Sequence, residues 1–185
     1  MYRIKKDKRI AMSAFMICSS MKEIMKEKGF DSISVSEVAD RSGISRATFY
    51  RLFDSTRDVL QYICDSIEEK ARNEYNKHEI TTADELAIFA FNFIFQCSDD
   101  IEAILKSGKQ EMLYRSFQEF FNGFMPLEED ITSKTEMVYI KEAMNAGLAS
   151  ILFVWLKRGK KESAEDLLAI FKNFMHAMAN KSNTK

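Results

Sequence analysis

Apolar residues recur along most of the chain at spacings of three and four residues, which is the period of an amphipathic helix. The first such segment, residues 7–28, interleaves apolar positions such as Met21 and Ile24 with lysines and glutamates. Gly29 follows it, and a glycine at that place predicts a left-handed C-cap. We therefore expect a long N-terminal helix that ends just before Gly29.

A serine or threonine followed three residues later by an acidic residue marks the start of most further helices, because such a pair can bond the first backbone N–H groups. These pairs are Ser34 with Glu37, Ser55 with Asp58, Thr82 with Glu85, Ser133 with Glu136 and Ser163 with Asp166. The expected helices are 7–28, 35–42, 46–52, 56–77, 83–97, 100–106, 109–124, 134–157 and 164–179. The pattern predicts an all-α fold of about nine helices.

Residues 89–95 also permit a strand, because phenylalanine occupies every second position. The i, i+4 pairs Phe89/Phe93 and Phe91/Phe95, together with the cap upstream and the length of the segment, favour a helix. Such a helix is apolar on nearly all sides. We expect it to be buried or to line a cavity.

Charge is distributed unevenly along a chain whose net charge is −1. Residues 1–57 hold 12 Lys and Arg against 7 Asp and Glu, a balance of +5, so the remaining 15 and 21 give residues 58–185 a balance of −6. This asymmetry indicates a polyanion-binding domain, residues 1–57, attached to a second domain, residues 58–185. One proline and six glycines are too few turn residues for a β-sandwich or barrel.

Three cysteines without a CxxC pair argue against a disulfide framework or a structural zinc site and suit a reducing cytoplasm. The basic residues 3–9 and the apolar residues 10–18 imitate a secretory leader, but the amphipathic spacing continues to Met25 without a cleavage site. No apolar run is long enough to span a bilayer. We expect a cytoplasmic protein with no metal, no cofactor and no membrane partner.

The most specific motif is residues 34–53, where two short helices are joined by a tight turn at Gly43. This is the layout of a DNA-binding helix-turn-helix, whose second helix enters the major groove. The exposed side chain of Arg46 suits guanine, and the helix start at Ser45 offers N–H groups to a phosphate. Small apolar residues such as Ala39 would also suit any three-helix core.

Residues 8–62 resemble the TetR family of one-component bacterial regulators. The matching positions are Ser34, Val38-Ala39, Gly43-Ile44-Ser45, Tyr50 to Phe53 and Ser55 to Leu60. Residues 141–167 resemble the C-terminal region of a Firmicutes-type branch of this family. The resemblance implies a homodimeric transcriptional regulator, a repressor rather than an activator, that binds a double-stranded DNA operator and responds to a small molecule or another input.

Two positions depart from the family pattern: Leu52 stands for its usual histidine and Thr56 for its usual phosphate-contacting lysine. These departures keep an alternative open, a helical interaction protein that has kept the fold but lost DNA binding. A basic N-terminal arm could also reach an adjacent minor groove. The DNA-binding residues that we predict are Ser34, Ser45, Arg46, Ala47, Thr48, Tyr50, Arg51, Thr56 and Arg57, with Lys5, Lys6 and Lys8 on the arm.

The last two expected helices carry apolar and small residues that suit a four-helix bundle between two chains, and operator-binding domains of this type are used in pairs. The interface residues that we predict are Ile140, Met144, Gly147, Ile151, Trp155, Leu167, Phe171 and Phe174. The same residues would also suit a core within one chain.

Eight of the 15 phenylalanines lie between Phe89 and Phe124. In the resembling proteins this region encloses an effector pocket, and bulky adaptable side chains suit a small apolar molecule. A solid core would contain the same residues. The pocket residues that we predict are Phe89, Phe93, Cys97, Met112, Tyr114, Phe117 and Phe121.

Enzyme chemistry finds little support in the sequence. His78 and His176 lack partners at metal-binding spacing, and no nucleophile motif, phosphate-binding glycine loop or HExxH motif occurs. We therefore interpret the chain as a regulator and not an enzyme.

Overall fold

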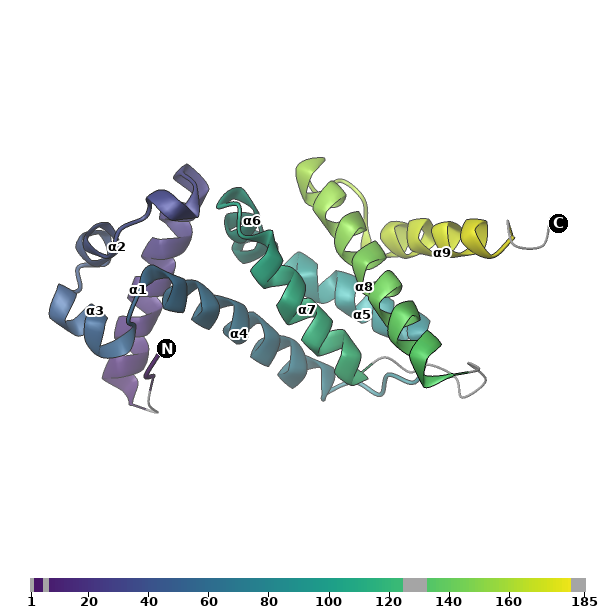
Figure 1. Cartoon of the computed structure of the whole chain (residues 1–185), viewed down its shortest axis with the longest axis horizontal. Coiled ribbons are helices and arrows are strands. Elements are labelled where there is room, and N and C mark those ends of the chain that lie inside the picture. Colours follow the sequence, from purple (N-terminus) through teal and green to yellow (C-terminus); the bar gives the residue numbers. More distant parts are fainter. Residues whose placement is uncertain (1, 5–6, 125–132, 181–185) are drawn as a thin grey trace. The chain divides into compact units, whose positions relative to one another are not determined.

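The computed structural model of the chain describes residues 2–4, 7–124 and 133–180 (Figure 1). The α-helices of this part are α1 (Lys8–Glu27), α2 (Val35–Ser42), α3 (Arg46–Leu52), α4 (Thr56–Tyr75), α5 (Ala83–Gln96), α6 (Ser98–Lys106), α7 (Gln110–Phe124), α8 (Lys134–Lys157) and α9 (Ala164–Asn180). A 3-10 helix, η1 (Phe30–Ser32), separates α1 from α2. The described residues contain no strand beyond one isolated bridge, so the all-α prediction is confirmed.

Side-chain caps open the helices where the serine and threonine pattern predicts them. The reciprocal capping box of Thr82 and Glu85 is present at the start of α5. The other caps are hydrogen bonds of 3.2–3.3 Å from the backbone N–H of Glu37 to Ser34, of Thr48 to Ser45, of Asp58 to Ser55, of Glu136 to Ser133 and of Asp166 to Ser163. Because α5 is helical throughout, the strand alternative for residues 89–95 is wrong.

The end of α1 differs from the prediction at Gly29. This residue has φ −63° and ψ 145°, an extended conformation, so the expected left-handed cap is wrong. The next residue, Phe30, is buried, and its backbone N–H donates to the carbonyl of Ser107 (3.0 Å), which lies just beyond α6. This tertiary contact sets the direction in which the chain leaves α1.

Two compact units divide the chain, and each draws on two parts of the sequence. The first comprises Met1–Lys70 and Asp99–Ser116, and the second comprises Ala71–Ser98 and Phe117–Lys185. This division differs from the boundary predicted after residue 57. Side chains on α1 explain part of the difference, since Lys22 pairs with Asp100 on α6 at 2.6 Å.

The core of the first unit lies where α1, α2 and α3 pack together. Its largest fully buried side chains include Ile17, Met21, Ile24, Met25, Phe49, Leu52, Phe53 and Leu60. In the second unit α9 packs against α5 and α8. There the ring of Trp155 on α8 stacks on Phe95 of α5, with centroids 4.1 Å apart and planes 4° apart.

By length and composition alone, α8 is apolar enough to cross a membrane. A core helix passes the same test. Leu148, Leu152 and Trp155 of α8 are buried within the second unit.

Candidate DNA-binding site and regulatory surfaces

The turn between α2 and α3 is fixed by its backbone. Gly43 has φ +67° and ψ 17°, and its N–H donates to the carbonyl of Asp40 (3.2 Å), while the N–H of Ile44 donates to that of Ala39 (3.0 Å). A Cβ at Gly43 would meet no atom within 4 Å. The glycine is therefore needed for its left-handed backbone and not for space. This is the turn that the helix-turn-helix motif predicts.

Helix α3 has one buried face and one exposed face. Phe49 and Leu52 are 0% and 1% exposed and belong to the core. Side chains at i and i+4 share a helix face, so the exposed residues form two adjacent rows. These residues are Arg46, Ala47, Tyr50 and Arg51. The structure thus brings four of the predicted DNA-binding residues together on one solvent-facing surface, which we call the α3 surface.

Ser45 and Thr48 are occupied with the start of α3. Besides the cap, the hydroxyl of Ser45 donates to Oγ1 of Thr48 (3.0 Å), and Thr48 is half-buried. Ser34 has the same capping role for α2 and is exposed. The backbone N–H groups of Arg46 and Ala47 have no partner inside α3, so this helix start can still meet a phosphate.

Acidic side chains of α1 and α2 are neutralised by neighbouring cations. Glu27 accepts hydrogen bonds of 2.6 and 3.0 Å from the guanidinium of Arg41, which holds the pKa of that carboxyl below its ordinary value. Glu37 pairs with Lys28 at 2.6 Å, so its carboxylate does not close the capping box predicted with Ser34. These pairs reduce the negative charge near the helix-turn-helix.

The arginines of the α3 surface are differently placed. Arg46, Arg51 and, at the start of α4, Arg57 are exposed and have no ion pair among the described residues. Arg46 makes one long contact, 3.5 Å from its Nη1 to the hydroxyl of Ser36. Free guanidinium groups are what a surface needs to bind phosphates and base edges.

The two positions that depart from the family pattern have different structural roles. Leu52 is 1% exposed, so its side chain packs in the core and presents no group to a ligand. Thr56 is the half-buried first residue of α4, beside the carboxylates of Asp54 and Asp58. A helix start with these carboxylates attracts a phosphate less than one that carries a lysine.

The N-terminal residues fold back onto the first unit. Tyr2 forms a β-bridge with Phe53, and the N–H of Arg3 donates to the carbonyl of Leu52 (2.8 Å). The hydroxyl of Tyr2 donates to Asp65 (2.7 Å), and burial together with this carboxylate raises the pKa of Tyr2 to about 12. The predicted arm is thus anchored at its beginning. Of its lysines, Lys8 is exposed, whereas two lie outside the described residues, Lys5 and Lys6.

A second set of contacts, which sequence reasoning missed, ties α6 and the turn after it to α1 and η1. Lys22 donates to Asp100 (2.6 Å), and both side chains are about a quarter exposed, at 26% and 25%. Lys109 pairs with Asp31 (3.0 Å), and its ammonium lies 5.4 Å from the ring centroid of Phe30. The partners are 78 residues apart in sequence, so no local pattern signals them.

The predicted interface residues of α8 and α9 separate into two groups. Trp155, Leu167 and Phe171 are 2–6% exposed within one chain, where α9 packs against α5 and α8, and their part in an interface stays a prediction. Phe174 is 46% exposed. Half-buried residues are Ile140, Gly147 and Ile151, and the side chain of Met144 lies outside the described residues.

An exposed apolar face nevertheless runs along α8. It consists of Tyr139, Ala143, Ala146, Ser150 and Val154, and we call it the α8 face. Tyr139 and Val154 are missing from the predicted set, although the spacing from 139 to 154 in steps of three and four could have indicated them. Beside it, Ile170 and Phe174 of α9 are each 46% exposed.

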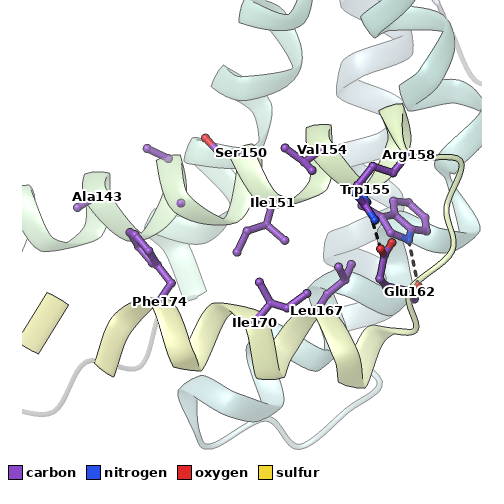
Figure 2. A pocket seen from close by; sticks show the side chains of 12 residues that line it. Ala143, Ser150, Ile151, Val154, Trp155, Arg158, Glu162, Leu167, Ile170 and Phe174 are labelled. Atoms are coloured by element: carbon purple, nitrogen blue, oxygen red, sulfur yellow. Dashed lines mark hydrogen bonds and ion pairs between the residues drawn. The ribbon is translucent and has the colours of Figure 1, made fainter. Parts of the chain in front are cut away.

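A groove of about 770 Å³ lies between the α8 face and α9 (Figure 2). Figure 2 shows Ile151 of α8 above Ile170 and Leu167 of α9, with Phe174 at one end. The other end is polar: Arg158 pairs with Glu162 at 3.3 Å, and Nε1 of Trp155 donates to the carbonyl of Glu162 (3.0 Å). The groove is thus largely apolar and open to solvent.

The predicted effector pocket is only partly brought together. Phe89 and Phe93 on α5 line a groove of about 640 Å³. Cys97 and Phe117 are half-buried and do not line it, while the side chain of Phe121 lies outside the described residues. Two further predicted members belong to the other compact unit, namely Met112 and Tyr114.

An all-α chain that opens with a helix-turn-helix and presents free arginines on its second helix has the architecture of a DNA-binding regulator. The family model of bacterial regulatory proteins, tetR family, matches residues 19–63, which include all of α2 and α3. No curated protein matches the sequence significantly.

Solved structures share the fold at low sequence identity. A TetR transcriptional regulator from Streptococcus agalactiae 2603V is 19% identical over 91% of this chain and 96% of its own, with a TM-score of 0.66. The dihydroxyacetone kinase operon activator DhaS is 17% identical over 90% and 95%, with a TM-score of 0.60. The regulator FadR from Bacillus subtilis, in complex with stearoyl-CoA, is 15% identical over 86% and 94%, with a TM-score of 0.56. Residues 19–63 thus match the tetR family of bacterial regulatory proteins, and the chain as a whole shares the fold of solved regulators of this kind.

Proposed function

We propose that the chain is a cytoplasmic, homodimeric repressor that binds a two-fold symmetric DNA operator through the α3 surface and releases it in response to a small effector. The α3 surface carries this proposal, since Arg46 and Arg51 are exposed on it without ion-pair partners among the described residues. Tyr50 lies beside them at 52% exposure, placed for a base edge or a phosphate.

A second copy of the chain is the partner that best fits the α8 face. Tyr139 and Val154 on this face are 72% and 56% exposed, which leaves large apolar side chains in contact with solvent. Ala143 and Ala146 between them are small enough to let two helices approach closely. Two copies of α8 and α9 would form a four-helix bundle and present two α3 surfaces to successive half-sites.

The effector proposal is supported by the contacts of α6. Lys22, Asp100 and Lys109 tie α6 and the following turn to α1 and η1, and α1 packs against α2 and α3. A ligand that shifts α6 would therefore also act on the α3 surface. FadR in complex with stearoyl-CoA is an example of a similar fold that holds a small molecule.

The DNA-binding proposal is tested by gel retardation with fragments that flank the gene of this chain, at two salt concentrations. We expect Arg46→Ala and Tyr50→Ala each to weaken specific binding by about 1–3 kcal/mol, the usual contribution of a base contact. Lys157→Ala is the matched control, because this lysine is exposed on α8 in the other unit and should leave binding unchanged.

Specific retardation that survives both α3 substitutions would contradict the proposed surface. If no fragment is retarded specifically, the alternative gains support, an interaction protein that has kept this fold without DNA binding. The uncharged Thr56, where the family carries lysine, is the feature that favours this alternative. Transcription of the neighbouring genes in a deletion strain separates repression, which we propose, from the activation that DhaS is named for.

A further inference from the structure

The groove beside α5 has an aromatic lining. Its volume is about 640 Å³, within the range of small-molecule sites, and its apolar walls include Ile80, Ile88, Phe89 and Phe93. The rings of Phe89 and Phe93 lie 17° from parallel, with centroids 6.2 Å apart. Both side chains line the groove while being only 9% and 7% exposed, and the ring of Phe89 also contacts those of Tyr75 and His78.

The rim of the same groove is acidic. Glu74 and Glu79, near the end of α4, and Asp84 and Glu85, at the start of α5, all line it, and no lysine or arginine does among the described residues. His78 is the remaining titratable group in the lining. The carboxylates therefore set the sign of the local potential.

Two of these carboxylates face cations at the edge of the groove. Lys77 donates to Glu74 (2.6 Å), and Lys172 of α9 pairs with Asp84. Glu85 is held by the N–H groups of Thr81 and Thr82 as part of the helix cap. These contacts keep the pKa of Glu74 and of Glu85 below the ordinary value, so both stay ionised at neutral pH.

Glu79 differs from the other three carboxylates. It is exposed and has no ion pair among the described residues. Four carboxylates against two lysines leave the groove with an excess of negative charge, and Glu79 is the carboxylate available to a ligand.

We propose that this groove binds an amphipathic organic cation, whose apolar body packs on Phe89 and Phe93 and whose positive charge lies near Glu79. The carboxylates attract the positive charge, and the apolar lining favours the body of the molecule. The same rim disfavours a fatty carboxylate or another anion. The claim that this cation is the effector rests on the proposed function. The claim that it binds the groove does not.

The test uses two ions of the same shape and opposite charge, tetraphenylphosphonium and tetraphenylborate, titrated calorimetrically into the full chain. We expect tetraphenylphosphonium to bind saturably, to raise the melting temperature and to bind more weakly as salt is added. Tetraphenylborate should show no saturable binding over the same concentrations. Equal binding of the two ions would overturn the proposal.

Charge reversal at the rim locates the site. We expect Glu79→Lys to lower the affinity for tetraphenylphosphonium by about two- to fivefold, the size of effect that an exposed charge contact gives. Glu23→Lys, an exposed position on α1, makes the same change in net charge and should leave the affinity unaltered. Equal affinity in the wild type and Glu79→Lys would overturn the assignment of the groove.

The outcome for the groove is separate from that for DNA. A chain that binds the cation through Glu79 but retards no DNA would support the groove and contradict the regulator. A chain that binds its operator but shows no preference for tetraphenylphosphonium would support the regulator and contradict the groove. Release of retarded DNA by tetraphenylphosphonium, lost in Glu79→Lys, would support both.

Discussion

At the scale of single residues, Asn145 on α8 is the side chain least suited to its surroundings. It is 3% exposed, and neither its Nδ2 nor its Oδ1 has a hydrogen-bond partner in the described part of the chain. A buried amide without partners costs about 1–3 kcal/mol of stability. Its neighbours on this side of α8 are apolar, among them Leu148, Ala149 and Leu152.

We therefore expect Asn145→Leu to raise the free energy of unfolding by about 1–2 kcal/mol, because it removes unpaired polar atoms and buries an apolar side chain of similar volume. Denaturant titration of the full chain measures the change. Asn173→Leu is the control, since Asn173 is exposed on α9 and shares only the gain in helix propensity. An Asn145→Leu variant less stable than the wild type would mean that the amide has a role that the geometry does not show.

Single residues also show why the α3 surface could be predicted from the sequence. Arg46 and Tyr50 lie one helical turn apart, so a correct helix and its two buried residues, Phe49 and Leu52, suffice to place them on the exposed face. The consequence of Leu52 was harder to foresee. Its burial depends on how the domain packs. From the sequence alone, Leu52 could equally have been a surface position that had lost a contact to DNA.

At the scale of secondary-structure elements, local signals were reliable and tertiary ones were not. The cap of Ser45 and the capping box of Thr82 with Glu85 formed as predicted, because each depends on residues three positions apart. Gly29 was predicted wrongly because the segment after it is held by Ser107, far along the chain. The predicted effector pocket is brought together only in part, at Phe89 and Phe93, since the density of phenylalanines does not reveal which rings line a cavity.

The two helix-ending glycines provide a matched pair for a stability experiment. We expect Gly43→Ala to destabilise the chain by about 1 kcal/mol, because φ is +67° there and alanine is strained in that conformation. Gly29→Ala should be neutral or stabilise by up to about 1 kcal/mol, because φ is −63° and alanine reduces the entropy of the unfolded chain.

Neither substitution creates a clash, since a Cβ at Gly29 or Gly43 meets no atom within 4 Å. The difference between the two variants in chemical or thermal unfolding therefore reports backbone conformation alone. Equal effects at the two positions would contradict the conformations described for them.

At the scale of the whole molecule, the exposed apolar surface and the proposed two-fold operator both require a second copy of the chain. A single α3 surface reads one half-site, and specific regulators gain affinity and selectivity by presenting two. Burial against a second copy would explain the exposure of the α8 face. The proposed function therefore predicts that a substitution on α8 that prevents pairing also weakens DNA binding. This should hold although α8 and the helix-turn-helix belong to different compact units.

This requirement leads to a prediction for Ala146, which is exposed in the middle of the α8 face. Ala146→Arg would place a long cation where two copies of α8 must approach, so we expect light scattering to give the mass of one chain for the variant and of two for the wild type. Specific DNA retardation should weaken at least about tenfold, and the melting temperature should no longer rise with protein concentration. Ala169→Arg, an exposed position on the far side of α9 from the groove, should remain a dimer and bind DNA normally. An Ala146→Arg variant that still dimerises would move the interface elsewhere, and a monomeric variant that still binds a full operator with wild-type affinity would show that α3 does not need a partner.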